Sequence, residues 1–498
     1  MQATVSTART QHDEAAVAKH ILIFSDGTGQ MGGLRPDQTL SNVYKLYRAM
    51  RPGPTSPIDP GVQYAFYDPG LGAAAAGGGF RQRIHNRFSA ALGTGIDENI
   101  IDCYVAIIAN YEPGDRISLF GFSRGAYTVR SLANVMNLCG VPREDGDGHP
   151  VPRHGPHLRK IATDAVRYVY NHGAGKKRDR YEYQREKKAL RFRKKYACEG
   201  IGADGESQGN VQPDFIGVFD TVASLTTRTA SLIVSAIALS LVALVAYTAY
   251  QGWLWACMGT TLLAVFMLYR AARVWAGQFK YFFEDPERRI HLWNPLHWPA
   301  AIRAGHFANW NGSNYDEYVD REVGFLRHAL SIDENRKRFP RVPWGRSEDI
   351  EWNNEQGNDA WMRQIWFAGN HSDIGGGYPE AESRLSDIPL AWMVEELKKA
   401  LPDVIIRSDL LQTWPDSSGL QHDERKRFRL ALPDWLRKIT PGWMTWGHGP
   451  REPNDAATLH PSVVERFKYA HVPFLDEMKP YRPPNLKTHH RVGSFYTP

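Results

Sequence analysis

The sequence predicts an α/β fold in which a mainly parallel sheet has flanking helices and is interrupted by a hydrophobic helical hairpin. Three observations support this prediction. Short apolar runs that end in turn or polar residues alternate with segments of helical periodicity. One of these runs leads directly into a G-x-S-x-G pentapeptide, and an uncharged stretch from Thr229 to Tyr269 interrupts the alternation. In such a fold the functional residues are expected at the carboxyl ends of the strands.

Length and composition limit the possible classes of protein. The chain has 498 residues, enough for one large α/β domain with insertions. A net charge of +6 is too small to indicate a nucleic-acid partner. The four cysteines are widely scattered and have no zinc-ligand spacing, so neither a metal nor a cofactor is predicted. Residues 1–18 contain no apolar signal segment and are predicted to be a flexible tail.

Each predicted element follows from a local pattern. The run HILIFS at 20–25 ends in Asp-Gly-Thr-Gly, and the run YAFY at 64–67 ends in Asp-Pro-Gly, as strands followed by turns do. Residues 98–111 and 126–138 have helical periodicity. Further strands are predicted at 117–120 (ISLF), 215–219 (FIGVF) and 365–367 (IWF).

The pentapeptide Gly121-Phe122-Ser123-Arg124-Gly125 stands between a predicted strand and a predicted helix. In the α/β-hydrolase fold a nucleophilic serine occupies such a strained turn, and the glycines allow close backbone packing. We therefore predict an α/β-hydrolase-like fold with Ser123 as nucleophile. The oxyanion hole is expected to use the N–H of Arg124 and an N–H from the loop containing Gly27 and Thr28.

A nucleophilic serine needs a base and an orienting acid, which α/β-hydrolases place in the order Ser, acid, His. Asp220 follows the predicted strand at 215–219 and is a candidate acid. His371 follows the predicted strand at 365–367, whereas His460 precedes Pro461 at the start of a predicted helix. Asp373 is an alternative acid. The spacing leaves both choices open.

The uncharged stretch predicts a transmembrane hairpin. Residues 231–250 have the length of one bilayer crossing, and residues 253–269 supply a second, slightly shorter span after Gln251-Gly252. Basic residues flank both open ends, which places the catalytic domain in the cytoplasm beside an inner membrane. A buried helical pair is the alternative interpretation.

A basic segment supports contact with an anionic membrane surface. Residues 176–195 contain 11 basic and 3 acidic side chains. Anionic headgroups attract such segments, although a solvated charged helix explains the pattern equally well.

These patterns divide the chain into six parts. After the tail come a first part of the hydrolase core (19–224), the transmembrane hairpin with its flank (225–285) and a cap-like insertion (286–345). A second part of the core (346–400) and a C-terminal cap or tail with His460 (401–498) complete the chain.

Five motifs together resemble a known family. FSDGTG, GFSRGAYTVRSLA, GVFDTVAS, FAGNHSDIGGGY and LHPSVVER occur here in that order. They resemble an α/β-hydrolase domain family that includes type VI secretion lipase effectors, which act as phospholipases. The resemblance implies a Ser-Asp-His esterase, with phospholipids as a plausible substrate class. Ser123 matches the family serine, Asp220 its acid and His460 its late histidine.

The combined prediction is a membrane-anchored serine hydrolase. It would cleave carboxylic esters of phospholipids or other acyl lipids through an acyl-enzyme. The hairpin departs from the plain family domain, so an enzyme acting on lipids of its own cell is at least as plausible as a secreted toxin. The alternative is a non-catalytic membrane scaffold that retains the hydrolase fold.

Overall fold

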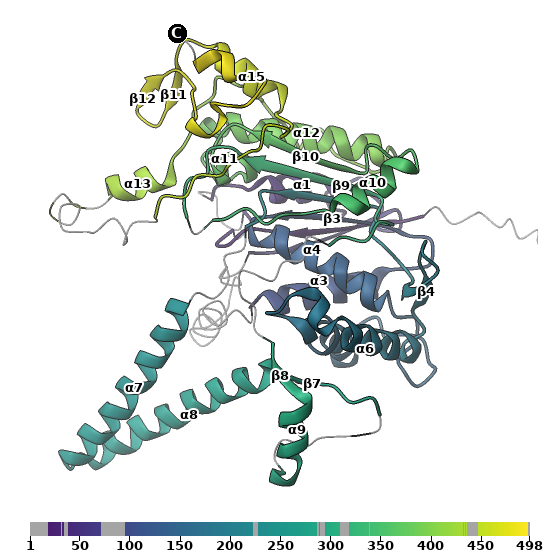
Figure 1. Cartoon of the computed structure of the whole chain (residues 1–498), viewed down its shortest axis with the longest axis vertical. Helices are drawn as coiled ribbons and strands as arrows, with labels where there is room; N and C mark the ends of the chain where they lie inside the picture. Colours follow the sequence, from purple (N-terminus) through teal and green to yellow (C-terminus); the bar gives the residue numbers. More distant parts are fainter. Residues whose placement is uncertain are drawn as a thin grey trace, which may run out of the picture.

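A six-stranded parallel sheet runs through the middle of the molecule (Figure 1). The computed structural model describes residues 18–30, 32–33, 38–70, 95–222, 228–285, 288, 294–308, 318–337, 339–431, 433, 435 and 447–496. The strand order is β10-β9-β6-β3-β1-β2, and all neighbouring strands are parallel. The strands are β1 (His20–Ser25), β2 (Gln63–Asp68), β3 (Arg116–Phe122), β6 (Phe215–Phe219), β9 (Phe325–Ser331) and β10 (Met362–Phe367).

Helices cover both faces of the sheet because its strands are apolar on both sides. In β1, Ile21 and Ile23 belong to one buried cluster, whereas Leu22 and Phe24 belong to another. The first cluster includes α3 (Gly95–Asn110) and α4 (Arg124–Cys139), with α5 (Pro156–Thr163) and α6 (Glu182–Lys195) packed outside them. The second cluster includes α1 (Asn42–Met50) and α12 (Arg384–Ala400). The predicted parallel α/β sheet with flanking helices is thereby confirmed.

Strand β9 was not predicted, although it lies between β6 and β10 in the sheet. It falls within residues 286–345, which the sequence suggested as a cap. Its sequence, FLRHALS, does not read as a buried strand because Arg327 and His328 interrupt the apolar run. Both side chains are buried, and Arg327 Nε donates to Glu396 Oε2 on α12 at 2.6 Å. An ion pair formed across two elements thus replaces the expected apolar contact.

The C-terminal region packs against the β10 edge of the sheet. Helix α15 (Pro461–Lys468) and strand β11 (Val472–Phe474) share a buried cluster with Leu330 of β9 and Trp366 of β10. Strand β12 (Glu477–Lys479) pairs with β11. The N–H of Trp366 donates to Thr458 at 2.9 Å. This region therefore continues the hydrophobic core beyond the sheet edge.

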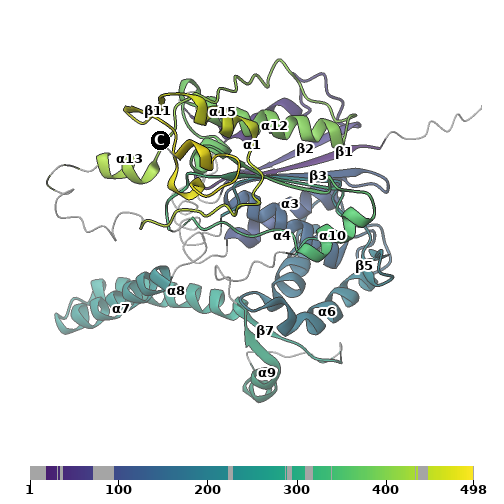
Figure 2. The ribbon, with the colours of Figure 1, turned by 45° about the horizontal axis from the view of Figure 1, so that its top comes forward.

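Helices α7 (Arg228–Tyr250) and α8 (Leu254–Gln278) project from the body as a packed pair (Figures 1 and 2). We call them the α7–α8 pair. A turn containing Gly252 joins them, and the hydroxyls of Thr248 and Thr260 hydrogen-bond between them at 3.2 Å. The chain returns through β7 (Phe279–Tyr281), α9 (Trp298–Ala304) and β8 (Gly305–Phe307).

The predicted bilayer crossing needs correction. In the part of the chain that the structure describes, no helix combines the length and apolar composition that a membrane span requires. In α8 the uncharged run ends at Tyr269. Its 16 residues from Leu254 rise about 24 Å as a helix, whereas the hydrocarbon core of a bilayer is about 30 Å thick.

Candidate active site

Ser123 occupies a strained turn between β3 and α4. It precedes the first residue of α4 and has φ 59° and ψ −118°, a conformation that non-glycine residues rarely adopt. Its N–H donates to Phe219 O on β6 at 3.0 Å. The side chain is thereby held at the carboxyl end of a central strand, as the pentapeptide predicts.

The two glycines of the pentapeptide are required by close backbone contacts. A Cβ at Gly121 would lie 2.5 Å from Ala126 Cα, and one at Gly125 would lie 2.0 Å from Ser25 O. Any side chain at either position would separate α4 from β3 or β1.

Asp220 is the residue immediately after β6 and is completely buried, with φ 45°. Its Oδ2 lies 2.5 Å from His371 Nδ1 and 3.0 Å from Arg451 Nη2. Its Oδ1 accepts from the N–H of Ser331 at 3.0 Å and from Arg451 Nη1. Burial raises the pKa of Asp220, but Arg451 and His371 outweigh it and hold this pKa well below its ordinary value. The carboxylate is ionised at neutral pH.

His371 is the first residue of the short helix α11 (His371–Gly375). Its ring packs against Phe122 and Phe339, with centroid distances of 4.7 and 5.3 Å. Burial lowers the pKa of His371, and the bond to Asp220 opposes this effect only in part. A neutral ring that donates from Nδ1 to Asp220 leaves Nε2 as a proton acceptor.

A cavity of about 510 Å³ connects Ser123 with this histidine. Ser123 and His371 both line it, and so do the three residues of the predicted oxyanion hole, Gly27, Thr28 and Arg124. The N–H of Gly27 donates to Asp26 Oδ1 at 2.7 Å, so this donor is already engaged. The N–H groups of Thr28 and Arg124 remain the better candidates.

Asp26 fixes the loop that contains Gly27. Its buried carboxylate accepts from the hydroxyls of Ser41 and Tyr67, the latter at 2.7 Å. Burial raises the pKa of Asp26 to about 6, although these hydrogen bonds oppose the shift. Asp26 therefore joins the backbone of this loop to the side chains of Ser41 and Tyr67.

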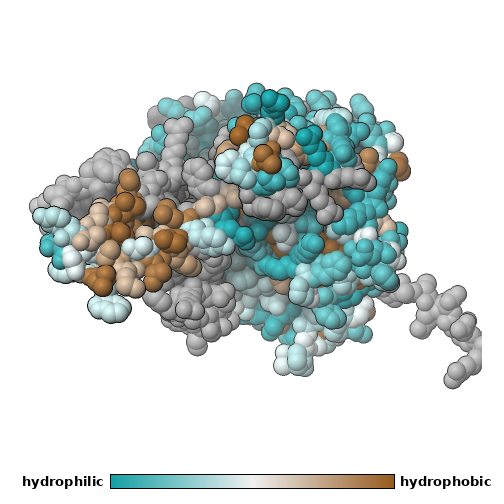
Figure 3. Space-filling model, turned by 90° about the horizontal axis from the view of Figure 1, so that it is seen from below, coloured by the Kyte–Doolittle hydropathy of each residue, from teal (hydrophilic) through white to brown (hydrophobic). Residues whose placement is uncertain are grey.

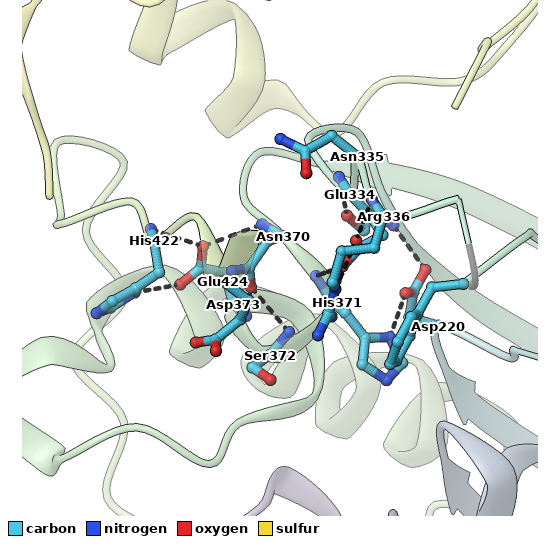
Figure 4. A network of polar contacts seen from close by, with 12 residues as sticks. Asp220, Glu334, Asn335, Arg336, Asn370, His371, Ser372, Asp373, His422 and Glu424 are labelled. Carbon is cyan, nitrogen blue, oxygen red and sulfur yellow. Dashed lines mark hydrogen bonds and ion pairs between the residues drawn. The ribbon is translucent and has the colours of Figure 1, made fainter. Parts of the chain in front are cut away.

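Asp373 contacts His422, whereas Asp220 contacts His371 (Figure 4). Its Oδ1 lies 2.8 Å from His422 Nδ1, and its Oδ2 accepts from the N–H of Asn370 at 3.0 Å. His422 Nε2 lies 3.2 Å from Glu382, and its ring stacks on Tyr378. Burial lowers the pKa of His422, but the two carboxylates outweigh it and raise this pKa. Asp373 thus completes the capping box of α11, in which Asn370 is the N-cap residue, and holds the loop containing His422.

His460 lies at the start of α15, beside the β10 edge. Its Nδ1 is 2.8 Å from the hydroxyl of Ser462, and its ring stacks on Phe367. Burial lowers its pKa to about 4. His460 does not line the described wall of the cavity that holds Ser123. The structure therefore brings Ser123, Asp220 and His371 together and places His460 elsewhere.

Sequence reasoning missed several residues around the site. Arg451 reaches Asp220 from a segment without regular structure, and no local pattern marks it. Glu334 accepts from the N–H of His371 at 3.3 Å and pairs with Arg336, which lines the cavity (Figure 4). Both lie in the segment that was suggested as a cap.

Among the described residues, no group of three or more histidine, cysteine, aspartate or glutamate side chains has the arrangement of a metal site. The described geometry places a candidate nucleophile, Ser123, and a candidate base, His371, on one cavity, with the ionised Asp220 bonded to His371. Such an arrangement is suited to acyl transfer.

Comparison with known proteins agrees with this chemistry. Residues 19–250 and 286–396, more than half of the chain, match the family described as the catalytic domain of Tle1-like phospholipase effectors of the T6SS. An uncharacterized protein of Saccharomyces cerevisiae is 32% identical over 130 residues, which are 25% of this chain and 18% of that protein. The chain thus matches less than a fifth of that relative.

A crystal structure of an uncharacterized protein from Pseudomonas aeruginosa is also similar. The similarity covers 86% of this chain and 52% of that one, with 14% identity and a TM-score of 0.33.

Proposed function

Because this chain belongs to the family of the Tle1-like phospholipase effector catalytic domain, we propose that it is a serine esterase that hydrolyses phospholipids or other acyl lipids. One observation carries the proposal. The buried Asp220 lies 2.5 Å from His371, and His371 lines the same cavity as the strained Ser123. We assign these residues as acid, base and nucleophile, and we prefer His371 to His460 as the base.

In the first half of the reaction, Ser123 Oγ attacks the ester carbonyl carbon while His371 Nε2 accepts the hydroxyl proton. Asp220 stabilises the resulting imidazolium through Nδ1–H. The carbonyl oxygen becomes an oxyanion, which accepts hydrogen bonds from the N–H groups of Arg124 and Thr28. The tetrahedral intermediate collapses, and His371 protonates the leaving alcohol.

In the second half, water attacks the acyl-serine ester and transfers a proton to His371 Nε2. Collapse of the second tetrahedral intermediate releases the fatty acid and returns the proton to Ser123 Oγ. The ionised Asp220 supports both halves, because each passes through a positively charged His371.

Lipid contact is the second part of the proposal. Large apolar side chains of the α7–α8 pair are exposed on many sides, including Leu239 (71%), Trp255 (83%) and Leu262 (69%). Figure 3 shows the apolar region over the part that projects to the left. A protein partner would cover one stripe of a helix, whereas lipid surrounds it, so we propose that the pair enters a lipid surface without crossing it. We further propose that this lipid surface is anionic and that it is the cytoplasmic face of a membrane.

Fluorophosphonate labelling of the purified protein tests the chemistry. Wild-type protein and His460→Ala should be labelled, whereas Ser123→Ala and His371→Ala should not. Ester hydrolysis should fall by about 10⁴-fold or more in the last two variants. Without a triad member, only the oxyanion hole and substrate binding still stabilise the transition state. Circular dichroism of each variant verifies folding.

Two outcomes would contradict the assignment. Labelling that survives His371→Ala but is lost in His460→Ala would make His460 the base. Absence of labelling in folded wild-type protein, with and without lipid vesicles, would favour the non-catalytic scaffold.

A further inference from the structure

The charges around the active-site cavity are unequal. Among the described residues of its wall, three are arginines, namely Arg124, Arg336 and Arg427, and one carries a carboxylate, Glu424. Two of the arginines have acidic partners. Arg336 Nη2 lies 2.7 Å from Glu334 Oε2, and Arg427 Nη1 lies 3.9 Å from Glu424 Oε1.

Arg124 differs from the other two arginines. Its side chain is half-buried on the cavity wall, one residue after the nucleophile. Among the residues that the structure describes, no carboxylate forms an ion pair with it. Burial lowers its pKa to about 10, and no described acidic neighbour opposes the shift. A guanidinium therefore faces the cavity with its charge unbalanced.

Resting on the proposed function, we propose that the Arg124 side chain recognises a phosphate that the ester substrate carries close to its scissile bond. The backbone N–H of the same residue is the expected oxyanion donor, so its side chain starts beside the reacting carbonyl. In a glycerophospholipid, the phosphate and the nearest acyl ester occupy adjacent glycerol carbons. A guanidinium binds phosphate through two parallel hydrogen bonds. These bonds would both attract the substrate and orient its ester group toward Ser123.

Binding to a Ser123→Ala background tests this role without hydrolysis. Calorimetry would compare soluble dihexanoyl phosphatidic acid with the uncharged dihexanoylglycerol. The phosphate-bearing probe should bind about 10- to 100-fold more tightly, as for a charged hydrogen-bonded contact. Adding Arg124→Gln should remove most of this preference, and Arg124→Lys should keep only part of it. If the Gln variant does not fold, a reduced preference in Arg124→Lys still tests the role of the guanidinium.

A matched control separates local recognition from net charge. Arg143 is exposed in the loop beyond the far end of α4, and Arg143→Gln removes the same charge. This change should leave the preference unaltered. A preference that survives Arg124→Gln, or no preference at all, would overturn the proposal. Competition by inorganic phosphate as effective as that of dihexanoyl phosphatidic acid would also overturn it, since it would indicate a site for free anions.

The result is distinguishable from failure of the proposed function. If wild-type protein hydrolyses no ester but the preference still depends on Arg124, the esterase proposal fails and the phosphate site stands. If hydrolysis occurs but the preference does not depend on Arg124, only the phosphate site fails.

Discussion

Asp220 accepts hydrogen bonds from both Arg451 and His371, and the charged Arg451 does more to lower its pKa. The guanidinium meets both carboxylate oxygens, whereas His371 meets only one. A residue from the C-terminal region therefore keeps the acid ionised in a buried site, where burial alone would favour its neutral form.

Replacing Arg451 should shift the pH dependence of hydrolysis. In Arg451→Gln the pKa of Asp220 rises, because the opposing charge is gone. The pKa of His371 rises too, because a nearby positive charge no longer disfavours its protonation. Both groups act in their deprotonated forms, so the acidic limb of the pH–rate profile should move to higher pH. Profiles of kcat/KM measured from pH 4 to 9 verify this.

Stability should change in the same variant. The depressed pKa of Asp220 gives stability that is present above the unfolded pKa of about 3.9 and is lost as pH falls through the folded pKa. Breaking a buried pair costs about 3–5 kcal/mol. Urea denaturation at pH 7 should show this loss in Arg451→Gln but not in Arg143→Gln. An unshifted acidic limb together with wild-type stability would refute the role of Arg451.

At the scale of elements, the elbow depends on the contact between α4 and β1. In Gly125→Ala, the new Cβ would lie 2.0 Å from Ser25 O, a backbone atom that cannot rotate away. The helix must move, so we expect a loss of about 3 kcal/mol or more in the free energy of unfolding and loss of fluorophosphonate labelling.

A second helical glycine supplies the control for that change. A Cβ at Gly259 in α8 would meet nothing within 4 Å. Gly259→Ala should therefore keep wild-type stability or gain about 0.5–1 kcal/mol. Equal effects of the two substitutions in urea denaturation would show that helix propensity, rather than the contact with Ser25, governs the elbow.

The α7–α8 pair makes a prediction about lipid binding. The double substitution Leu239→Glu and Leu262→Glu places charges on exposed side chains, so the fold should persist while insertion into lipid becomes unfavourable. Flotation with phosphatidylglycerol vesicles should recover wild-type protein and at least about tenfold less of the double variant.

Ile201 offers a matched exposed position. It is 69% exposed in β4 (Glu199–Ile201), outside the α7–α8 pair. Ile201→Glu should float like wild-type protein. Undiminished flotation of the double variant would exclude the pair as the lipid-binding element.

At the scale of the whole molecule, the site is assembled from segments far apart in the chain. Local patterns predicted the parts that local structure determines: the strands at 20–25 and 215–219, and Ser123 in its strand–turn–helix context. The helix start at Pro461 was predicted correctly as well. The local patterns left His371 and His460 both open as the base, and only the family resemblance favoured His460. The histidine that contacts Asp220 is set by tertiary packing, and in the structure it is His371.

The same limit applies to β9 and Arg451. Strand β9 contains Arg327, whose burial is understandable only once Glu396 of α12 is placed beside it. Arg451 lies in a segment with no periodicity at all. Sequence periodicity reports which face of an element is apolar, and it contains no information about which distant charge will neutralise a buried one.

The C-terminal region should therefore be inseparable from the core. Val463 of α15 is completely buried in the cluster that includes Leu330 and Trp366, and the chain just before it carries Arg451 to Asp220. Val463→Asp would bury an unpaired charge and should cost at least about 3 kcal/mol. Met478, 63% exposed in β12, provides the control Met478→Asp, which should be neutral.

Urea denaturation followed by circular dichroism, together with the rate of Ser123 labelling, measures both effects. If the C-terminal region is part of one cooperative core, Val463→Asp should lower the unfolding midpoint of the whole chain in a single transition. Labelling of Ser123 should decline over the same range of urea. Two separate transitions, with labelling retained after the first, would show instead that this region folds apart from the sheet and that Arg451 is dispensable for the acid.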